Sequence, residues 1–210
     1  MPLKWPLIGS RRSDRQPIAL EATNRGSLYV AQDLPALADL VNSGVVWSAG
    51  EASLVASVIA PPTTTAQISL YNNEPEGGRS YLVLRDYAII GAVPAGLSQA
   101  GLSHCIHKDK PTTRPTADIA AASITNMRAR TGPYIGNAII DLAATVADDL
   151  WKPLGYSILN AVSGVGWQLD VWLDSLVILP PGGLYSIAVV ASSTTVTTRA
   201  GFTWAEVQLQ

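Results

Sequence analysis

From about residue 45 onward, short apolar runs alternate with polar turn sequences, which is a pattern typical of β-strands. The runs are rich in Val, Ile, Leu and Tyr, and clusters of Pro, Gly, Asn and Thr separate them. The strands predicted in this way cover residues 54–60, 67–71, 81–91, 101–107, 166–174, 176–179, 184–191 and 201–207. A spacing of roughly 8–12 residues between short strands favours an all-β sandwich or jelly roll.

In two of the predicted strands, simple alternation predicts the face on which each side chain lies. In the strand at 81–91 the first face holds Leu82, Leu84 and Asp86, and the second holds Tyr81, Val83, Arg85 and Tyr87. Apolar groups on both faces predict a central strand that is covered on two sides. In the strand at 166–174 one face holds Trp167, Leu169, Val171 and Leu173, which places Trp172 on the opposite face.

The rest of the chain carries weaker signals. Residues 27–30 fit a first strand, and residues 33–42 fit a short helix with Asp33 as N-cap, Pro35 in the first turn and Gly44 as the stop. Residues 139–151 fit either a helix or a strand with a turn. We therefore expect a single β-sandwich or jelly roll at 26–210, with one or two short helices at most, preceded by an extended arm at 1–25.

Composition favours a protein whose surface is covered by neighbours. Hydrophobic residues make up 48% of the chain and charged residues only 14%, against a usual charged share of about 25%. A surface with few charges does little to keep other surfaces away. The long uncharged stretches are interrupted by Pro, Gly and polar residues, so they predict turns between buried strands and no membrane span.

Charge is distributed unevenly along the chain. The net charge is −2, which gives no overall attraction to nucleic acid or acidic membranes. The first 25 residues form a basic arm that contains Lys4, Arg11, Arg12, Arg15 and Arg25. These cations are suited to pair with acidic groups on an adjacent subunit, and a solvated tail is the alternative. The lone Cys105 excludes an internal disulfide and indicates folding in a reducing cytoplasm.

Candidate chemistry is sparse. Cys105 and His107 fall on one face of a predicted strand, but zinc requires three or four ligands and the chain has one Cys and two His. A nucleophilic pair of Cys105 with His107 has no orienting third group in the sequence. Residues 96–100 lack the final Gly of a nucleophile elbow. We therefore predict no enzymatic activity, no catalytic or metal-binding residues and no cofactor.

The C-terminal part of the chain resembles a known group of proteins. Residues 177–191 run from an apolar strand through Pro180-Pro181-Gly182-Gly183 into a strand of small residues, and 201–207 close on an aromatic and acidic strand. This pattern, with the loop-to-strand passage at 68–84, is similar to jelly-roll virion structural proteins of tailed bacteriophages and covers about two thirds of the chain. The arm does not map onto the resemblance.

The resemblance implies a capsid decoration, cement or tail-associated protein that is made in the host cytoplasm and resides in the virion. Its expected partners are copies of itself, in a trimer or larger ring, and virion proteins such as the major capsid protein or the tail. The expected assembly contacts are Lys4, Trp5, Arg11, Arg12, Arg15 and Trp204. The alternative is a carbohydrate- or receptor-binding β-sandwich, which is suggested by the six tryptophans.

Overall fold

The computed structural model describes residues 7–10, 17–20, 36–62, 64–92, 99–109, 111, 113–128, 133–146, 151–160 and 166–208. The chain divides into two units, Met1–Asp39 and Leu40–Gln210. The first unit holds an antiparallel hairpin of β1 (Leu7–Ser10) and β2 (Pro17–Leu20). The strand expected at 27–30 lies outside the described residues.

The helix expected at 33–42 is confirmed as α1 (Ala36–Ser43). It ends at Gly44, whose φ of 78° is a left-handed conformation that glycine adopts without strain. The Gly44 N–H donates to the Val41 carbonyl at 2.9 Å, and the Ser43 hydroxyl donates to the Leu40 carbonyl at 2.7 Å. Among the described residues, no helix has the length and apolar character needed to span a membrane.

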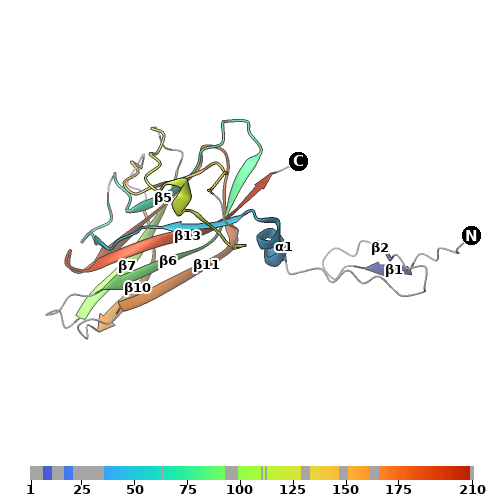
Figure 1. Cartoon of the computed structure of the whole chain (residues 1–210). Coiled ribbons are helices and arrows are strands. Elements are labelled where there is room, and N and C mark those ends of the chain that lie inside the picture. The colour runs from blue at the N-terminus through green and yellow to red at the C-terminus, as the bar shows by residue number, and fades with distance from the viewer. Residues whose placement is uncertain are drawn as a thin grey trace, which may run out of the picture. The chain divides into compact units, whose positions relative to one another are not determined.

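Two antiparallel sheets form the second unit (Figure 1). One sheet has the order β10 (Lys152–Asn160), β7 (Gln99–Asp109), β12 (Leu184–Ala191), β5 (Ile68–Asn72) and β9 (Ala138–Asp141). The other has the order β11 (Gly166–Leu179), β6 (Ser80–Ala92), β13 (Thr197–Gln208), β3 (Val46–Gly50) and β8 (Thr125–Asn126), and β4 (Val55–Ala56) also pairs with β13. A 3₁₀ turn, η1 (Ala121–Ser123), precedes β8.

The strand pairs are nested in sequence. β3 pairs with β13, β5 with β12, β6 with β11, and β7 with β10, so early strands meet late ones throughout. The chain also changes sheet between β6 and β7, between β10 and β11, and between β12 and β13. Eight strands connected in this way form a jelly roll, which confirms the predicted fold class.

Most predicted strands are present with shifted ends. The prediction at 184–191 matches β12, whereas the two short strands expected at 166–174 and 176–179 are one continuous strand, β11. The strand expected at 54–60 is reduced to β4 and a single bridge at Val58. The ambiguous region at 139–151 begins in a strand, β9. β3 and β10 have no counterpart among the predictions.

A β-bulge in β6 overturns one predicted set of faces. Asp86 pairs with Thr203 of β13, and Leu84 pairs with the next residue, Trp204, so Arg85 is extra. Side chains after the bulge therefore change face. Tyr87 joins Leu84 in the core, and the prediction that Asp86 shares a face with Leu84 is wrong. The alternation predicted for β11 is confirmed at Leu169, Val171 and Leu173, which pack against the core.

The core lies between the sheets and is rich in aromatic rings. Phe202 and Trp204 of β13 are at most 1% exposed, and Tyr185 of β12 packs edge-on against Phe202 at 6.2 Å between ring centres. Tyr134 packs edge-on against Trp47 at 4.9 Å and against Trp204 at 6.1 Å. These rings come from both sheets and from the segment before β9, so the core joins parts that are distant in sequence.

The strand expected to be covered on two sides, β6, is buried mainly on one face, whereas β12 is buried on both. The inward side chains of β12, which include Ile187 and Val189, belong to the main core. Its outward side chains Leu184 and Ala188 pack instead with a second cluster that contains Trp151. The unbroken apolar run of β12 is therefore explained by cover on two sides.

Asn72, at the end of β5, is a polar link between the sheets. Its side-chain amide nitrogen donates to the carbonyls of Ser80 in β6 and Leu179 in β11, each at 2.9 Å, and its side-chain oxygen accepts from the Glu74 N–H at 3.1 Å. The side chain is fully buried. Because its partners are carbonyls of the opposite sheet, Asn72 fixes the distance between the two layers at this end.

We expect Asn72→Ala to lower the free energy of unfolding by about 3 kcal/mol, because it leaves two buried carbonyls without a donor. Chemical denaturation measures this value directly. Asn73→Ala is the matched control, since the Asn73 side chain accepts an exposed hydrogen bond from Arg114, and should cost less than about 1 kcal/mol. Equal losses in the two variants would contradict the role assigned to Asn72.

Candidate functional site

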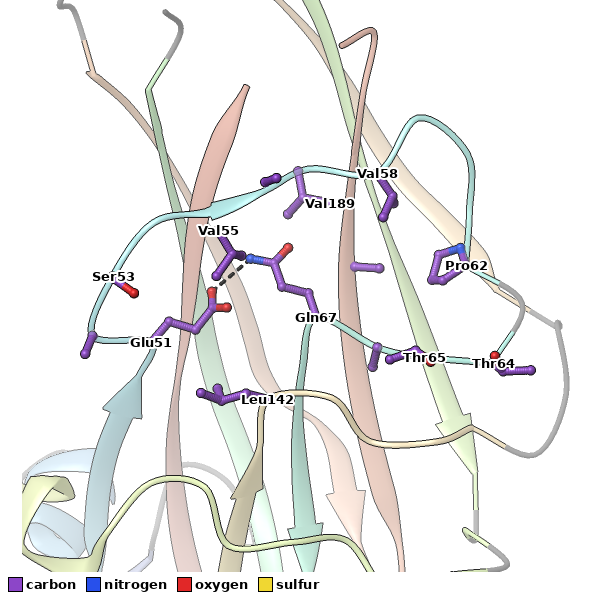
Figure 2. Close-up of a pocket in the computed structure, with 14 residues that line it drawn as sticks. Glu51, Ser53, Val55, Val58, Pro62, Thr64, Thr65, Gln67, Leu142 and Val189 are labelled. Carbon is purple, nitrogen blue, oxygen red and sulfur yellow. Dashed lines mark hydrogen bonds between the residues drawn. The ribbon is translucent and has the colours of Figure 1, made fainter. Parts of the chain in front are cut away.

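The segment between β3 and β5 covers a pocket at one end of the sandwich (Figure 2). Backbone hydrogen bonds hold this segment in place: the Ser57 N–H donates to the Val196 carbonyl at 2.9 Å, and the Val58 carbonyl accepts from Ala191 at 2.8 Å. β4, within the segment, adds to β13. The segment therefore reaches across from one sheet to the other.

The pocket has a volume of about 530 Å³ and a mainly apolar lining. Most of the wall comes from the covering segment; Val189 lies beside that segment near Val58, and Leu142 contributes from the opposite side (Figure 2). Hydroxyl groups of Ser53, Thr64 and Thr65 also line it. A volume of this size lies within the range of pockets that hold small ligands or a large side chain.

A buried carboxyl group supplies the main polar feature of the pocket. Glu51 is 7% exposed, and its Oε2 accepts hydrogen bonds from the Ala200 N–H at 2.6 Å and from the Gln67 amide at 2.8 Å. The same Gln67 nitrogen donates to the Thr198 hydroxyl at 3.2 Å. Burial raises the pKa of Glu51 above its ordinary value, and these hydrogen bonds partly offset the rise. Both described hydrogen bonds fall on Oε2, so Oε1 keeps its capacity to bond with an occupant.

This arrangement is suited to binding. General acid–base or nucleophilic catalysis requires a second reactive group within hydrogen-bond reach. The described partners of the Glu51 carboxyl are an amide side chain and a backbone N–H. The pocket can therefore accept an apolar group that carries one hydrogen-bonding atom.

The segment that covers the pocket also exposes apolar side chains. Leu54, Val58 and Ile59 are 44%, 40% and 67% exposed, and Val58 also lines the pocket. Three large apolar groups within six residues give the covering segment an apolar outer surface. We call this surface, with the pocket, the rim site. Exposed apolar surface of this kind marks interaction sites in soluble proteins.

A partly buried carboxyl group lies on β13. Glu206 accepts hydrogen bonds from the Tyr134 hydroxyl, from the Trp204 indole N–H at 3.3 Å and from the Asn137 N–H at 3.3 Å. Burial raises the pKa of Glu206 to about 7, and the nearby carboxylate of Glu74 adds to the rise. This cluster attaches the segment before β9 to the central strand of the opposite sheet.

The expected assembly contacts are mostly outside the described residues. Lys4, Trp5, Arg11, Arg12 and Arg15 all lie there. The remaining residue, Trp204, is fully buried in the core, so its ring is not available to a partner of the folded chain. Its contribution is to packing within the sandwich.

The Cys and His residues lie on β7. Backbone pairing places His107 opposite Ser186 and Cys105 opposite Ala188 of β12. Their side chains are outside what the structure describes. Among the side chains that it does describe, no group of three or more His, Cys, Asp or Glu converges as a metal site would require.

Sequence reasoning did not select Glu51 or Gln67. One signal was available: Glu51 is the last charged residue before a long uncharged stretch at 52–73. A single charge beside such a stretch is a candidate for a buried, hydrogen-bonded acid. Its partners Gln67 and Ala200 are separated from it by long loops, so the contact itself had no local signature.

We expect the free energy of unfolding to fall as pH rises from about 4.5 to about 7, with Glu206 as one cause. The pKa of Glu206 is near 4.5 when unfolded and about 7 when folded. The folded chain therefore holds an extra proton in this window, and that stabilisation is lost as pH rises through 7. Glu206→Gln should reduce the slope of the free energy of unfolding against pH by at most about 1.4 kcal/mol per pH unit. Denaturation at several pH values measures this slope. Glu76→Gln, at an exposed position, is the control, and an unchanged slope in Glu206→Gln would contradict the assignment.

No protein-family model matches this chain, and no curated protein matches it in sequence. The proposed function therefore rests on the rim site and the jelly roll.

Proposed function

We propose that this protein is a non-enzymatic structural protein of a virus particle, of the kind found in tailed bacteriophages as capsid decoration, cement or tail-associated proteins. It assembles with copies of itself, in a trimer or larger ring, and with other virion proteins. The single observation that carries the proposal is the rim site, where Leu54, Val58 and Ile59 expose apolar surface on the segment that covers a pocket. The jelly roll is an architecture that viral capsid proteins use, which agrees with the proposal.

The rim site has the properties of a protein–protein contact. Binding energy at such contacts is concentrated in a few apolar or aromatic side chains that fill pockets. Here the pocket accepts an anchoring side chain, and the apolar groups of the covering segment exclude water from it. The Glu51 carboxyl at the pocket favours an anchor that carries an N–H or O–H group, because a buried acid with unmade hydrogen bonds lowers stability.

The sheet edges offer a second means of association. Among the described strands, β11 pairs only with β6, and β10 pairs only with β7. β11 is 14 residues long. A long edge strand presents unpaired N–H and carbonyl groups that another chain can pair with. The edges therefore provide hydrogen bonds to complement the apolar contact at the rim site.

The rim site makes a direct prediction about assembly. The double variant Leu54→Ser, Ile59→Ser removes apolar surface that is exposed in the single chain, so the fold should be retained. Its self-association should weaken by about tenfold or more, since each lost apolar anchor costs of order 1 kcal/mol. Light scattering across a concentration series measures the change toward the monomer mass of 22.1 kDa.

Met127→Ser is the matched control, because Met127 is also an exposed apolar residue, at 48%, but it follows β8 and lies outside the covering segment. It should leave the mass unchanged. A wild-type chain that stays monomeric at all concentrations and binds no virion component would overturn the proposal. A weakening of equal size in both variants would show that general surface hydrophobicity, not the rim site, drives association.

The N-terminal arm makes a separate prediction. Removal of residues 1–25 deletes Lys4, Trp5, Arg11, Arg12 and Arg15. If the arm extends subunit contacts, the truncated chain should form smaller or weaker assemblies, and the difference from the full chain should shrink at high salt. Light scattering at low and high salt tests this, and identical masses for the two chains would remove the arm from the assembly.

A further inference from the structure

The outer face of the six-stranded sheet carries a row of partly exposed polar side chains that ends in an exposed tryptophan. Strand register places Trp172 of β11 beside Asp86 of β6, Asp86 beside Thr203 of β13, and Thr203 beside Ser48 of β3. Directly paired residues of neighbouring strands have their Cβ atoms about 5 Å apart. The four side chains therefore form one continuous line across the sheet, with an aromatic ring at one end.

The adjacent row contains glycines, and their position makes the face concave. Here Ala88 of β6 pairs with Gly201 of β13, and Gly201 pairs with Gly50 of β3. A Cβ added at Gly50 would lie 2.8 Å from the Ala200 carbonyl oxygen, so the two strands leave no room for a side chain there. The result is a trough of about 250 Å³, lined by Gly50 and Gly201 together with Ser48, Asp86, Thr203 and Arg199.

The polar groups of the trough include both donors and acceptors. The Thr203 hydroxyl donates a hydrogen bond to the Asp86 carboxyl, and both Asp170 and Arg85 lie close enough to Asp86 to affect its charge. Arg199 and Glu51 also line the trough, so acidic and basic groups lie together on this face. The face offers hydrogen bonds to a ligand whose groups can both donate and accept, which is the property of a hydroxyl group.

Trp172 is the most exposed aromatic side chain among those the structure describes. Its side chain is 70% exposed, on the same face as the trough. An indole ring offers a flat apolar surface and one N–H donor, so an exposed ring next to a polar trough is suited to a ligand with one apolar and one polar side. A sugar ring has this character, since its C–H groups form an apolar face and its hydroxyls surround the edge.

We propose that this trough is a carbohydrate-binding site for a neutral oligosaccharide, one ring of which stacks on Trp172 while neighbouring rings bond through their hydroxyls to Asp86, Thr203 and Arg199. The glycine floor admits a sugar ring because the two glycines carry no side chains. This inference goes beyond assembly through the rim site. Glu51 lines both the rim-site pocket and the trough, but the residues proposed to contact the sugar differ from those changed in the rim-site variants. It gives a structural protein a surface that holds glycans.

The test uses the full chain and a printed array of neutral oligosaccharides built from glucose, galactose, mannose and N-acetylglucosamine. We expect at least one glycan to bind, and the best of them is then titrated by calorimetry against three variants. Trp172→Ala should weaken binding by about tenfold, because it removes the stacking surface. Asp86→Asn should weaken it by a smaller factor, since the amide keeps one acceptor oxygen.

Ile178→Ala is the matched control, because Ile178 is also exposed on β11, at 56%, and is paired with Val83, whereas Trp172 is paired with Asp86. It should bind as the wild type does. Melting temperatures of all variants confirm that they fold, which is expected because Trp172 is not part of the core.

Two results would overturn the proposal. The first is an array without any neutral glycan bound by the full chain. The second is a Trp172→Ala variant that binds the glycan as tightly as the wild type, whether or not its self-association, measured by light scattering, is weakened. Weakened self-association in that variant would identify the face as a contact between copies. Because the rim-site variants are tested separately, failure of the glycan site leaves the assembly proposal standing, and the reverse also holds.

Discussion

The apolar layer between the two sheets is the interaction on which the rest of the structure depends. β13 is central to it, because this strand pairs with β3, β4 and β6 and contributes Phe202 and Trp204 to the core. Edge-on contacts among aromatic rings add specific geometry to the burial of area. With this layer in place, the ends of the sandwich can carry features that cost stability, such as a pocket, a buried acid and a partly buried one.

Those two acids lie where chain segments meet the sheets. Glu51 ties the segment that covers the pocket to β13 through the Ala200 N–H, and Glu206 ties β13 to Tyr134 and to Asn137. Each is desolvated, so each has a raised pKa. The apolar groups of the rim site and Trp172, in contrast, are exposed, so their removal leaves the core intact. Glu51 serves both roles, because it holds the covering segment and also lines the pocket.

Sequence pattern was sufficient for the fold class and for most strands, because alternation and turn residues are local signals. Residues 184–191 were predicted with the ends that β12 has. The bulge at Arg85 was not predictable, because it depends on how β6 pairs with β13 and leaves no local mark. The trough and the rim site were missed for the same reason: Gly50 meets Gly201, and Glu51 meets Gln67, only when strands distant in sequence pair.

The nested order of the strand pairs has a consequence for how the protein is made. β3 is among the earliest strands to leave the ribosome, yet its main partner is β13, at the other end of the chain. A topology with such distant contacts folds slowly, because long loops must close before strand pairing can stabilise the chain. The jelly roll therefore cannot close until β13 has been made, and before then the chain passes through a stage with unpaired apolar strands, when neighbouring copies or chaperones can capture it.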